Sequence, residues 1–194
     1  MVRALVACRP IGRAVVLGST QEDPTGEMPP GASLTRRSSG GGAVWVAPGE
    51  MLWVDVDLPR SDLLWDDDVG RSFLWLGRAW VSALAKVGVK GASLHEAGLV
   101  CGPTGRAICF ATRGPGEVFV AGRKVVGITQ RRTREGTRFH CAALLRWSPN
   151  VLARALGIPE GQWPQLKEVA AGLDVSADAL MAALIEAMPK GSGA

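Results

Sequence analysis

The chain has 194 residues, of which 47% are hydrophobic and 21% charged. This balance is typical of one globular domain with a hydrophobic core. The formal net charge of +4 is mild, and no basic stripe is interleaved with stacking aromatic residues, which argues against nucleic-acid binding. No run approaches the roughly 18 apolar residues that cross a bilayer. We therefore expect a cytoplasmic protein that does not associate with membranes.

The cysteines give no sign of a metal or redox centre. Their spacing contains no C-x-x-C pair, the usual mark of zinc and redox motifs; they are Cys8, Cys101, Cys109 and Cys141. Asp55 and Asp57 alternate along one predicted strand without further metal ligands nearby, so solvated or paired carboxylates are expected there. We predict reduced thiols and no metal site.

The first half of the chain predicts short strands followed by one long helix. Residues 14–18 form an apolar run that ends in glycine, as in a buried strand. Residues 34–46 are expected to form two short strands joined by a glycine turn. Apolar and polar residues alternate over residues 52–58, which indicates a strand with one buried face. Apolar residues then recur at helical spacing over residues 69–87, and Gly88 ends the helix.

The second half predicts more strands and then a helical tail. The expected strands cover residues 108–111, 118–120, 124–130 and 139–147. Ala121 and Gly122 suit a tight hairpin turn. Ser148 and Pro149 are typical of a helix start, and Ser176 can cap a last helix. Several strands, a long central helix and a helical tail indicate an α+β fold.

The segment from Arg36 to Val44 reads RRSSGGGAV and combines two guanidinium groups with three glycines. Glycine lets a ligand approach the main chain closely, and successive N–H groups with arginine can bind phosphate or carboxylate. The segment is neither a P-loop nor a dinucleotide-binding fingerprint. By itself it fits an anion site or a flexible hairpin loop equally well.

A second block, GRKVVGITQRR from Gly122 to Arg132, is followed by Phe139 and His140. In this order and spacing, the two blocks resemble the lipoate–protein ligase and octanoyltransferase family, which is related to the biotin protein ligases. The resemblance spans about residues 14–147. It implies a mixed, largely antiparallel sheet flanked by helices, as in a class II synthetase-like core. We accordingly expect a catalytic domain over residues 1–147 and a helical extension of it over residues 148–194.

The resemblance also implies roles for particular residues. The first block would close over an acyl-adenylate, with one arginine reaching phosphate and the other packing; its residues are Arg36, Arg37, Gly40, Gly41, Gly42, Ala43 and Val44. Lys124, which shares its block with Gly127, would contact the acyl–phosphate junction, where an ammonium stabilises developing charge. His140 would lie near the floor of the acyl pocket. Without the resemblance, Lys124 would be interpreted as a solvated hairpin lysine.

Cys109 lies fifteen positions before Lys124, which is similar to the cysteine octanoyltransferases of the family. In those enzymes a thiolate carries the acyl group, and a nearby ammonium makes the cysteine nucleophilic. The alternative is a buried strand cysteine that only packs. The expected catalytic residues are thus Lys124 and, if the chain is a transferase, Cys109.

The implied function is a lipoate–protein ligase-like enzyme that acylates the lysine of a lipoyl domain through an acyl-adenylate. It would use ATP with Mg²⁺ and lipoate or octanoate. The alternatives are an octanoyl transferase that takes the acyl group from acyl carrier protein and needs no other cofactor, or a non-catalytic acyl-binding module.

Two departures from the family bear on this choice. The histidine–aspartate pair that often follows G-G-G-A-V is replaced by Trp45 and Val46. After Trp147 we expect a helical segment in place of the separate accessory domain that such ligases use to finish adenylation, so the chain would be partial, need an accessory subunit or act as a transferase.

Overall fold

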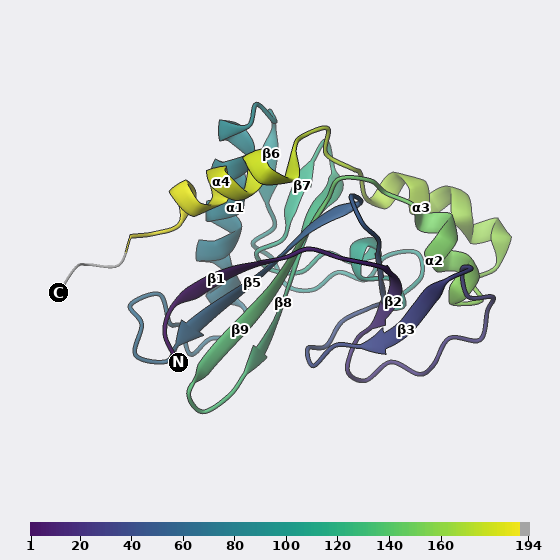
Figure 1. Ribbon diagram of the computed structural model, residues 1–194, viewed down its shortest axis with the longest axis horizontal. Helices are drawn as coiled ribbons and strands as arrows, with labels where there is room; N and C mark the ends of the chain where they lie inside the picture. The colour runs from purple at the N-terminus through teal and green to yellow at the C-terminus, as the bar shows by residue number, and fades with distance from the viewer. Residues whose placement is uncertain (191–194) are drawn as a thin grey trace.

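The computed structural model describes residues 1–190, and within them a six-stranded antiparallel sheet forms the centre of the fold (Figure 1). Its strand order is β1-β5-β9-β8-β7-β6. The strands are β1 (Ala4–Cys8), β5 (Met51–Pro59), β9 (Gly136–Leu144), β8 (Arg123–Arg132), β7 (Val118–Val120) and β6 (Ala92–Leu94). Every neighbouring pair runs antiparallel. The predicted α+β fold with a largely antiparallel sheet is confirmed.

A smaller sheet contains β2 (Arg13–Leu17), β3 (Ala32–Arg36) and β4 (Val44–Val46) in the order β3-β2-β4. Strand β2 pairs with β3 in parallel and with β4 antiparallel. The two strands predicted on either side of the glycines are present as β3 and β4, but they do not pair with each other as the strands of a hairpin would. Because β2 lies between β3 and β4, the glycine segment crosses from one edge of this sheet to the other.

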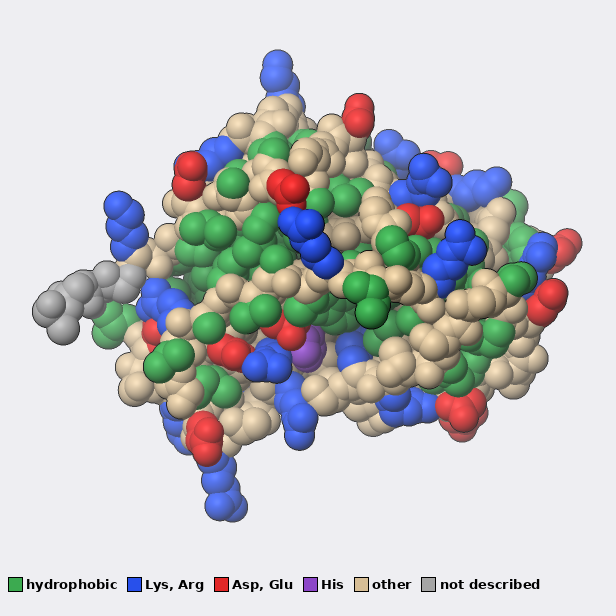
Figure 2. All heavy atoms as spheres, viewed as in Figure 1, with side chains coloured by type: hydrophobic (Ala, Val, Ile, Leu, Met, Phe, Trp, Pro, Cys, Tyr) green, Lys and Arg blue, Asp and Glu red, His purple; other side chains and the backbone are tan. Residues whose placement is uncertain are grey.

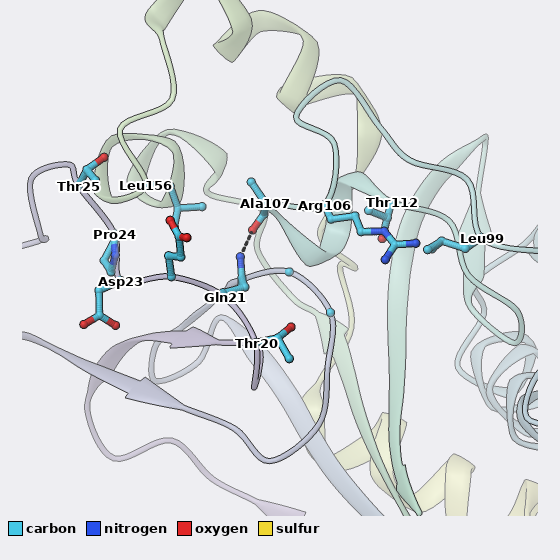
Figure 3. A pocket seen from close by; sticks show the side chains of 13 residues that line it. Thr20, Gln21, Asp23, Pro24, Thr25, Leu99, Arg106, Ala107, Thr112 and Leu156 are labelled. Atoms are coloured by element: carbon cyan, nitrogen blue, oxygen red, sulfur yellow. Dashed lines mark hydrogen bonds between the residues drawn. The ribbon is translucent and has the colours of Figure 1, made fainter.

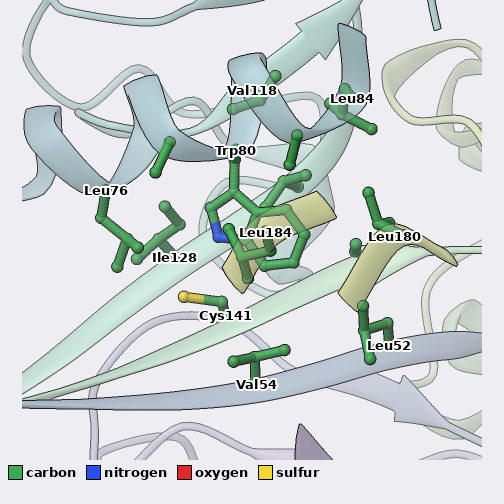
Figure 4. Close-up of a cluster of buried hydrophobic side chains, with 14 of the residues drawn as sticks. Leu52, Val54, Leu76, Trp80, Leu84, Val118, Ile128, Cys141, Leu180 and Leu184 are labelled. Atoms are coloured by element: carbon green, nitrogen blue, oxygen red, sulfur yellow. The ribbon is translucent and has the colours of Figure 1, made fainter. Parts of the chain in front are cut away.

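One face of the large sheet is covered by α1 (Leu74–Lys86) and α4 (Ala177–Ala187). The helical spacing of Leu76, Trp80 and Leu84 places these fully buried side chains on one side of α1. They pack with buried side chains of the sheet and of α4, including Val54, Ile128, Cys141, Leu180 and Leu184 (Figure 4). The predicted helix begins with a 3₁₀ turn, η1 (Arg71–Phe73), and Gly88 follows it with a φ of +85°.

The helices α2 (Pro149–Ala155) and α3 (Trp163–Val169), with η3 (Glu160–Gln162) before α3, lie at the other end of the molecule beside the smaller sheet (Figure 1). Buried side chains from both parts, among them Val15, Leu17, Leu152 and Leu166, form a second core. The predicted cap of the last helix is confirmed, since the Ser176 hydroxyl accepts from the backbone N–H of Ala179. The final four residues of the predicted extension, 191–194, lie outside the described residues.

Other segments also differ from the sequence predictions. Strands β1 and β6 were not predicted, and residues 108–111, predicted as a strand, form the 3₁₀ turn η2 (Cys109–Ala111). The reason is the backbone of the glycine segment: Ala43 donates to the carbonyl of Ala107 at 2.8 Å, and the N–H of Cys109 donates to the Ala43 carbonyl at 3.0 Å. These bonds form a single parallel bridge between Ala43 and Ile108, and the chain turns into η2 directly after it.

The predicted turn at Ala121 and Gly122 is confirmed, because both residues have positive φ, 48° and 75°. Lys and Arg side chains are interspersed with Asp and Glu side chains over the visible face of the molecule (Figure 2). Over residues 1–190, no helix has the length and apolar composition that crossing a membrane requires.

Candidate functional site

The glycine segment borders a cavity of about 620 Å³. Gly41 and Gly42 line one part of it, and side chains from four other segments complete the wall, among them Gln21, Leu99, Arg106 and Thr112 (Figure 3). The Gln21 amide bridges the wall, donating to the Ala107 carbonyl at 3.0 Å and accepting from the Gly18 N–H at 2.9 Å. The cavity is therefore framed by backbone that hydrogen bonds hold in place.

Arg37 braces the glycine segment from within. Its Nη2 donates to the carbonyls of Gly40 and Gly42 at 2.7 and 2.9 Å, and its Nε donates to the Ser39 hydroxyl at 3.2 Å. Burial lowers the pKa of this guanidinium. Arg37 therefore has a structural role. The sequence had assigned such a packing role to one of Arg36 and Arg37 without deciding which.

Arg36 ties a different loop. Its Nη1 donates to the Gly18 carbonyl at 3.0 Å and to that of Gln21, and its Nη2 forms a 2.8 Å ion pair with Asp23. Gln21 and Asp23 both line the cavity. Arg36 thus shapes the rim of the cavity, and its guanidinium is occupied by protein groups.

The glycines of the segment are not equivalent. Gly41 has a φ of +99°, which favours glycine, and a Cβ there would lie 2.9 Å from Nη2 of Arg37. At Gly42 a Cβ would come within 2.6 Å of the backbone of Cys109, a distance at which something must shift. At Gly40 a Cβ would meet no atom of the described residues within 4 Å. Gly41 and Gly42 are thus required by geometry, and Gly40 is open to substitution.

The last two residues of the block, Ala43 and Val44, are buried in the cores beside the smaller sheet. Ala43 makes the backbone bonds that hold η2, and Val44 begins β4. Their side chains fill the core, so only their backbone is placed near the glycine segment.

Lys124 is fully buried, contrary to a solvated hairpin lysine. Its Nζ lies 2.6 Å from Oε1 of the equally buried Glu117 and donates to the carbonyls of Cys109 and Thr112 at 2.8 and 3.1 Å. Glu117 also accepts from the N–H of Gly114. Burial raises the pKa of Glu117, and the ammonium opposes that effect. Because Thr112 lines the cavity, the ammonium lies directly behind the cavity wall.

Gly127 makes room for this lysine. A Cβ at Gly127 would lie 3.3 Å from both Cε of Lys124 and the ring of Phe110, and Nζ of Lys124 sits 5.2 Å from the Phe110 ring centroid. The glycine of the second block is thus explained by side-chain packing rather than by a ligand.

Cys109 is buried at the start of η2 and packs with Val44, Phe110 and Ala142. The contact with Lys124 is made by the carbonyl of Cys109 rather than by its thiol. Cys109 and Lys124 are thus close in space, as their spacing in the sequence suggested, but the thiol is buried and does not contact the ammonium. A catalytic role for the thiol stays a prediction.

His140 lies on β9, on the face of the large sheet opposite α1. Its Nδ1 is 2.8 Å from Oδ1 of Asp55, which also accepts from the Trp53 indole N–H at 2.8 Å. Burial raises the pKa of Asp55, but the hydrogen bonds from His140 and Trp53 outweigh it and leave the pKa below its ordinary value. Solvated or paired carboxylates were expected on this strand. Both are paired, Asp55 with His140 and Asp57 in a bidentate pair with Arg138.

Sequence reasoning missed four residues of the site. Gln21, Arg106 and Thr112 come from segments without regular structure, and no local pattern marks them. Glu117 stands in the G-P-G-E stretch after Cys109, but its pairing with Lys124 follows only from the pairing of β7 with β8. Over residues 1–190, no group of three or more His, Cys, Asp and Glu side chains is arranged to hold a metal ion.

Comparisons with known proteins show which family and fold this chain is similar to. A family model described as the lipoyl protein ligase A/B catalytic domain matches residues 11–188. A Thermoplasma acidophilum protein assigned as a lipoate protein ligase is 25% identical with a TM-score of 0.70, covering 94% of this chain and 69% of that one. The same protein was also solved with bound lipoic acid.

Two further structures share the fold. Lipoate-protein ligase A bound with ATP is 23% identical with a TM-score of 0.66, covering 94% of this chain and 70% of the other. A lipoate-bound Plasmodium falciparum protein is 16% identical with a TM-score of 0.60, covering 94% and 45%. A comparison with curated proteins found no match. Because the family model spans most of the sequence, this chain belongs to the family of the lipoyl protein ligase A/B catalytic domain.

Proposed function

We propose that this chain acylates the lysine of a lipoyl domain as a lipoate–protein ligase does, through an acyl-adenylate. The observation that carries the proposal is the cavity beside the glycine segment, with Arg106 in its wall and Lys124 behind it. Relatives of the same fold were solved with lipoic acid and with ATP. Residues 1–147 would form the catalytic core, and residues 148–194 would extend the same domain.

The residues around the cavity suit an anionic nucleotide. Arg106 is exposed and makes no ion pair or hydrogen bond through its side chain among the described residues, so its guanidinium is available to a phosphate. The close backbone at Gly41 and Gly42 leaves room for phosphate oxygens on the cavity side. Mg²⁺ would accompany ATP, and the carboxylates of Glu22 and Asp23, oxygen ligands of the kind Mg²⁺ prefers, line the same cavity.

Two steps follow from this placement. A carboxylate oxygen of lipoate or octanoate attacks the α-phosphorus of ATP, and pyrophosphate leaves. The amine of the acceptor lysine then attacks the acyl carbon, an amide bond forms, and AMP leaves with the electrons of the C–O bond. Holding the two reactants together and stabilising charge on the oxygens supply the acceleration.

Lys124 has a defined task in this proposal. To contact the acyl–phosphate junction, its ammonium exchanges the carbonyls of Cys109 and Thr112 for ligand oxygens. The ion pair with Glu117 holds the ammonium at the cavity wall until then. Arg37 keeps the carbonyls of the glycine segment turned away from the ligand by bonding them itself.

The acceptor is proposed to be a lipoyl domain. One structure of the same fold concerns a bi-partite lipoate protein ligase of Thermoplasma acidophilum and its E2 lipoyl domain. We extend to this chain both the acceptor and a second component, an accessory subunit that would complete adenylation.

An octanoyl transferase is the second candidate, and the approach of Cys109 to Lys124 favours it. The acyl group would pass from acyl carrier protein to the Cys109 thiol as a thioester and then to the acceptor lysine. The buried thiol, with only the carbonyl of Cys109 bound to Lys124, fits the ligase better. A non-catalytic acyl-binding module is the third candidate.

One pair of reactions separates the three. The chain is incubated with ATP, Mg²⁺ and lipoate, or with octanoyl acyl carrier protein, and analysed by mass spectrometry with and without a lipoyl domain. Lipoyl-AMP formation by an unmodified chain supports the ligase. A thioester adduct that disappears in Cys109→Ser supports the transferase. Tight lipoate binding without product in either reaction supports the binding module.

A further inference from the structure

The large sheet carries a row of polar side chains on the face opposite α1. Thr129 of β8 is directly opposite His140 of β9, which is directly opposite Asp55 of β5. Directly opposed residues of antiparallel strands project from the same face of a sheet. These three side chains therefore form one continuous row, while Phe139 and Cys141 face the core on the other side.

This row meets the glycine segment. Oγ1 of Thr129 lies 2.9 Å from Oγ of Ser39, and a Cβ at Gly41 would lie 3.5 Å from Cγ2 of Thr129. Gly41 also lines the cavity. The glycine segment thus lies between the cavity and this row of polar side chains. Thr129 contacts the segment, and His140 lies on the neighbouring strand, directly opposite Thr129.

The hydrogen bond with Asp55 decides what His140 can do. A carboxylate only accepts, so Nδ1 of His140 carries the proton of the 2.8 Å bond. In the neutral ring, Nε2 is then an acceptor. Nε2 is buried and has no hydrogen-bond partner among the described residues, and a buried polar atom without a partner is costly. About 12% of the His140 side chain remains exposed, so part of this side chain lies at the surface although Nε2 itself is covered.

The chemistry of the reactants selects the partner of Nε2. Lipoate and octanoate offer no N–H group, and the amino group of adenine lies at the far end of the nucleotide from the acyl carbon. The remaining N–H donor is the ammonium of the acceptor lysine. The negative charge of Asp55 behind the ring favours a cation at Nε2, and the Trp53 ring, 6.0 Å from the imidazole, adds an aromatic wall.

We propose that His140, oriented by Asp55, accepts the proton of the acceptor lysine in the transfer step. An N–H bond of the ammonium breaks and its proton goes to Nε2. The freed amine forms the bond to the acyl carbon, and the C–O bond to AMP breaks, with the electron pair leaving on AMP. The nitrogen then loses its second proton to the phosphate of the departing AMP, which leaves the neutral amide. Asp55 is a positioning residue that sets the tautomer and stabilises the resulting imidazolium. This inference rests on the proposed ligase function.

Other charged groups share this face of the sheet and act on the same ring. They are Cys8 on β1, Asp57 on β5, Arg138 on β9 and Arg131 on β8. Asp57 and Arg138 neutralise each other in a bidentate pair. Burial, with the charge of Asp55, raises the pKa of the Cys8 thiol, which keeps it neutral. Among these charged groups, Asp55 is the one in direct contact with the ring, 2.8 Å from Nδ1.

The test combines an NMR spectrum of His140 with the rate of acyl transfer to a lipoyl domain. The chain has two histidines, so ¹⁵N NMR of labelled histidine, with His95→Gln to assign the signals, reads the tautomer of His140 directly. Single-turnover transfer from preformed lipoyl-AMP to a lipoyl domain is then measured against pH for wild type, Asp55→Asn and His140→Gln. Asp57→Asn is the matched control on the same strand and face.

The expected spectrum shows a protonated Nδ1 and a bare Nε2 in the wild type, and a changed tautomer in Asp55→Asn. Transfer is expected to slow by about 10²–10⁴-fold in Asp55→Asn and His140→Gln and to be little changed in Asp57→Asn. The increase of the transfer rate with pH should be lost in His140→Gln. Binding of lipoyl-AMP stays within about twofold in all variants.

Transfer at the wild-type rate in both site variants, or a protonated Nε2 in neutral wild-type His140, overturns the inference alone. A wild type that neither forms lipoyl-AMP nor transfers from it overturns the proposed function, and this inference with it. Where His140→Gln fails to bind lipoyl-AMP, the Asp55→Asn rate and spectrum decide.

Discussion

The ammonium of Lys124 lies 2.6 Å from a carboxylate oxygen of Glu117, and both side chains are buried beneath the wall of the cavity. A lysine proposed to meet a phosphate is thus held by a carboxylate of its own chain. Removing one partner of a buried ion pair leaves an uncompensated charge, whereas removing both costs far less. Single and double variants of this ion pair can therefore separate its contribution to folding stability from its contribution to catalysis.

We predict that Lys124→Ala loses about 3–5 kcal/mol of unfolding free energy, because Glu117 is left buried and charged. The double variant Lys124→Met with Glu117→Gln should recover most of this stability and still form no lipoyl-AMP. Thermal melting and adenylate formation are the two measurements. Wild-type adenylate formation by the double variant would assign Lys124 a purely structural role.

The glycine segment gives a prediction with an internal control. Gly41→Val forces a branched residue into a φ of +99°, at a cost of roughly 1 kcal/mol, and places its side chain beside Arg37 and Thr129. We expect a shift of only a few degrees in melting temperature but a loss of acyl-adenylate binding.

The control is Gly40→Ala, where the added methyl group meets no atom of residues 1–190 within 4 Å. It should bind as wild type does. Calorimetric titration with a non-hydrolysable lipoyl-adenylate analogue, beside the melting curves, measures both effects. Near-normal affinity in a folded Gly41→Val chain would remove the segment from the site.

Arg106 is predicted to bind the phosphates of ATP. A charge-assisted hydrogen bond contributes about 1.5–3 kcal/mol, so Arg106→Met should weaken ATP binding by roughly 10- to 150-fold and leave melting unchanged. Arg78→Met, which removes an exposed arginine paired with Glu96 away from the cavity, is the control. Equal ATP dissociation constants for the two variants would contradict the assignment.

Asp55 is predicted to make stability fall in acid. Its pKa lies below the ordinary value of 3.8, because the hydrogen bonds from His140 and Trp53 outweigh the effect of burial. A carboxyl whose pKa is depressed by folding contributes stability that is present above its unfolded pKa and is lost as pH falls through the folded pKa. Asp55→Asn should therefore melt below the wild type at pH 6.

That difference should shrink steadily as the pH is lowered below the ordinary aspartate pKa of 3.8, since protonated aspartic acid and asparagine are both neutral. Melting temperatures of the two proteins across this range are the measurement. A difference in melting temperature that does not depend on pH would show that the charge of the Asp55 carboxylate does not stabilise the fold.

Local patterns in the sequence determined much of the fold. Strand β5 was readable because every second residue is apolar, and α1 because its apolar residues recur at helical spacing. The turn at Gly122 and the cap at Ser176 depend on the conformational preferences of single residues. The two motif blocks indicated the family. All these signals arise from residues close together in the chain.

The tertiary structure decided everything that depends on which segments lie side by side. The glycine segment crosses β2 instead of turning a hairpin, since strand order is set by packing between distant elements. Likewise Arg37 serves the backbone, Lys124 is paired with Glu117, and His140 is paired with Asp55, 85 residues away. Buried charges take whichever partner the fold brings within reach, and no local pattern encodes that choice.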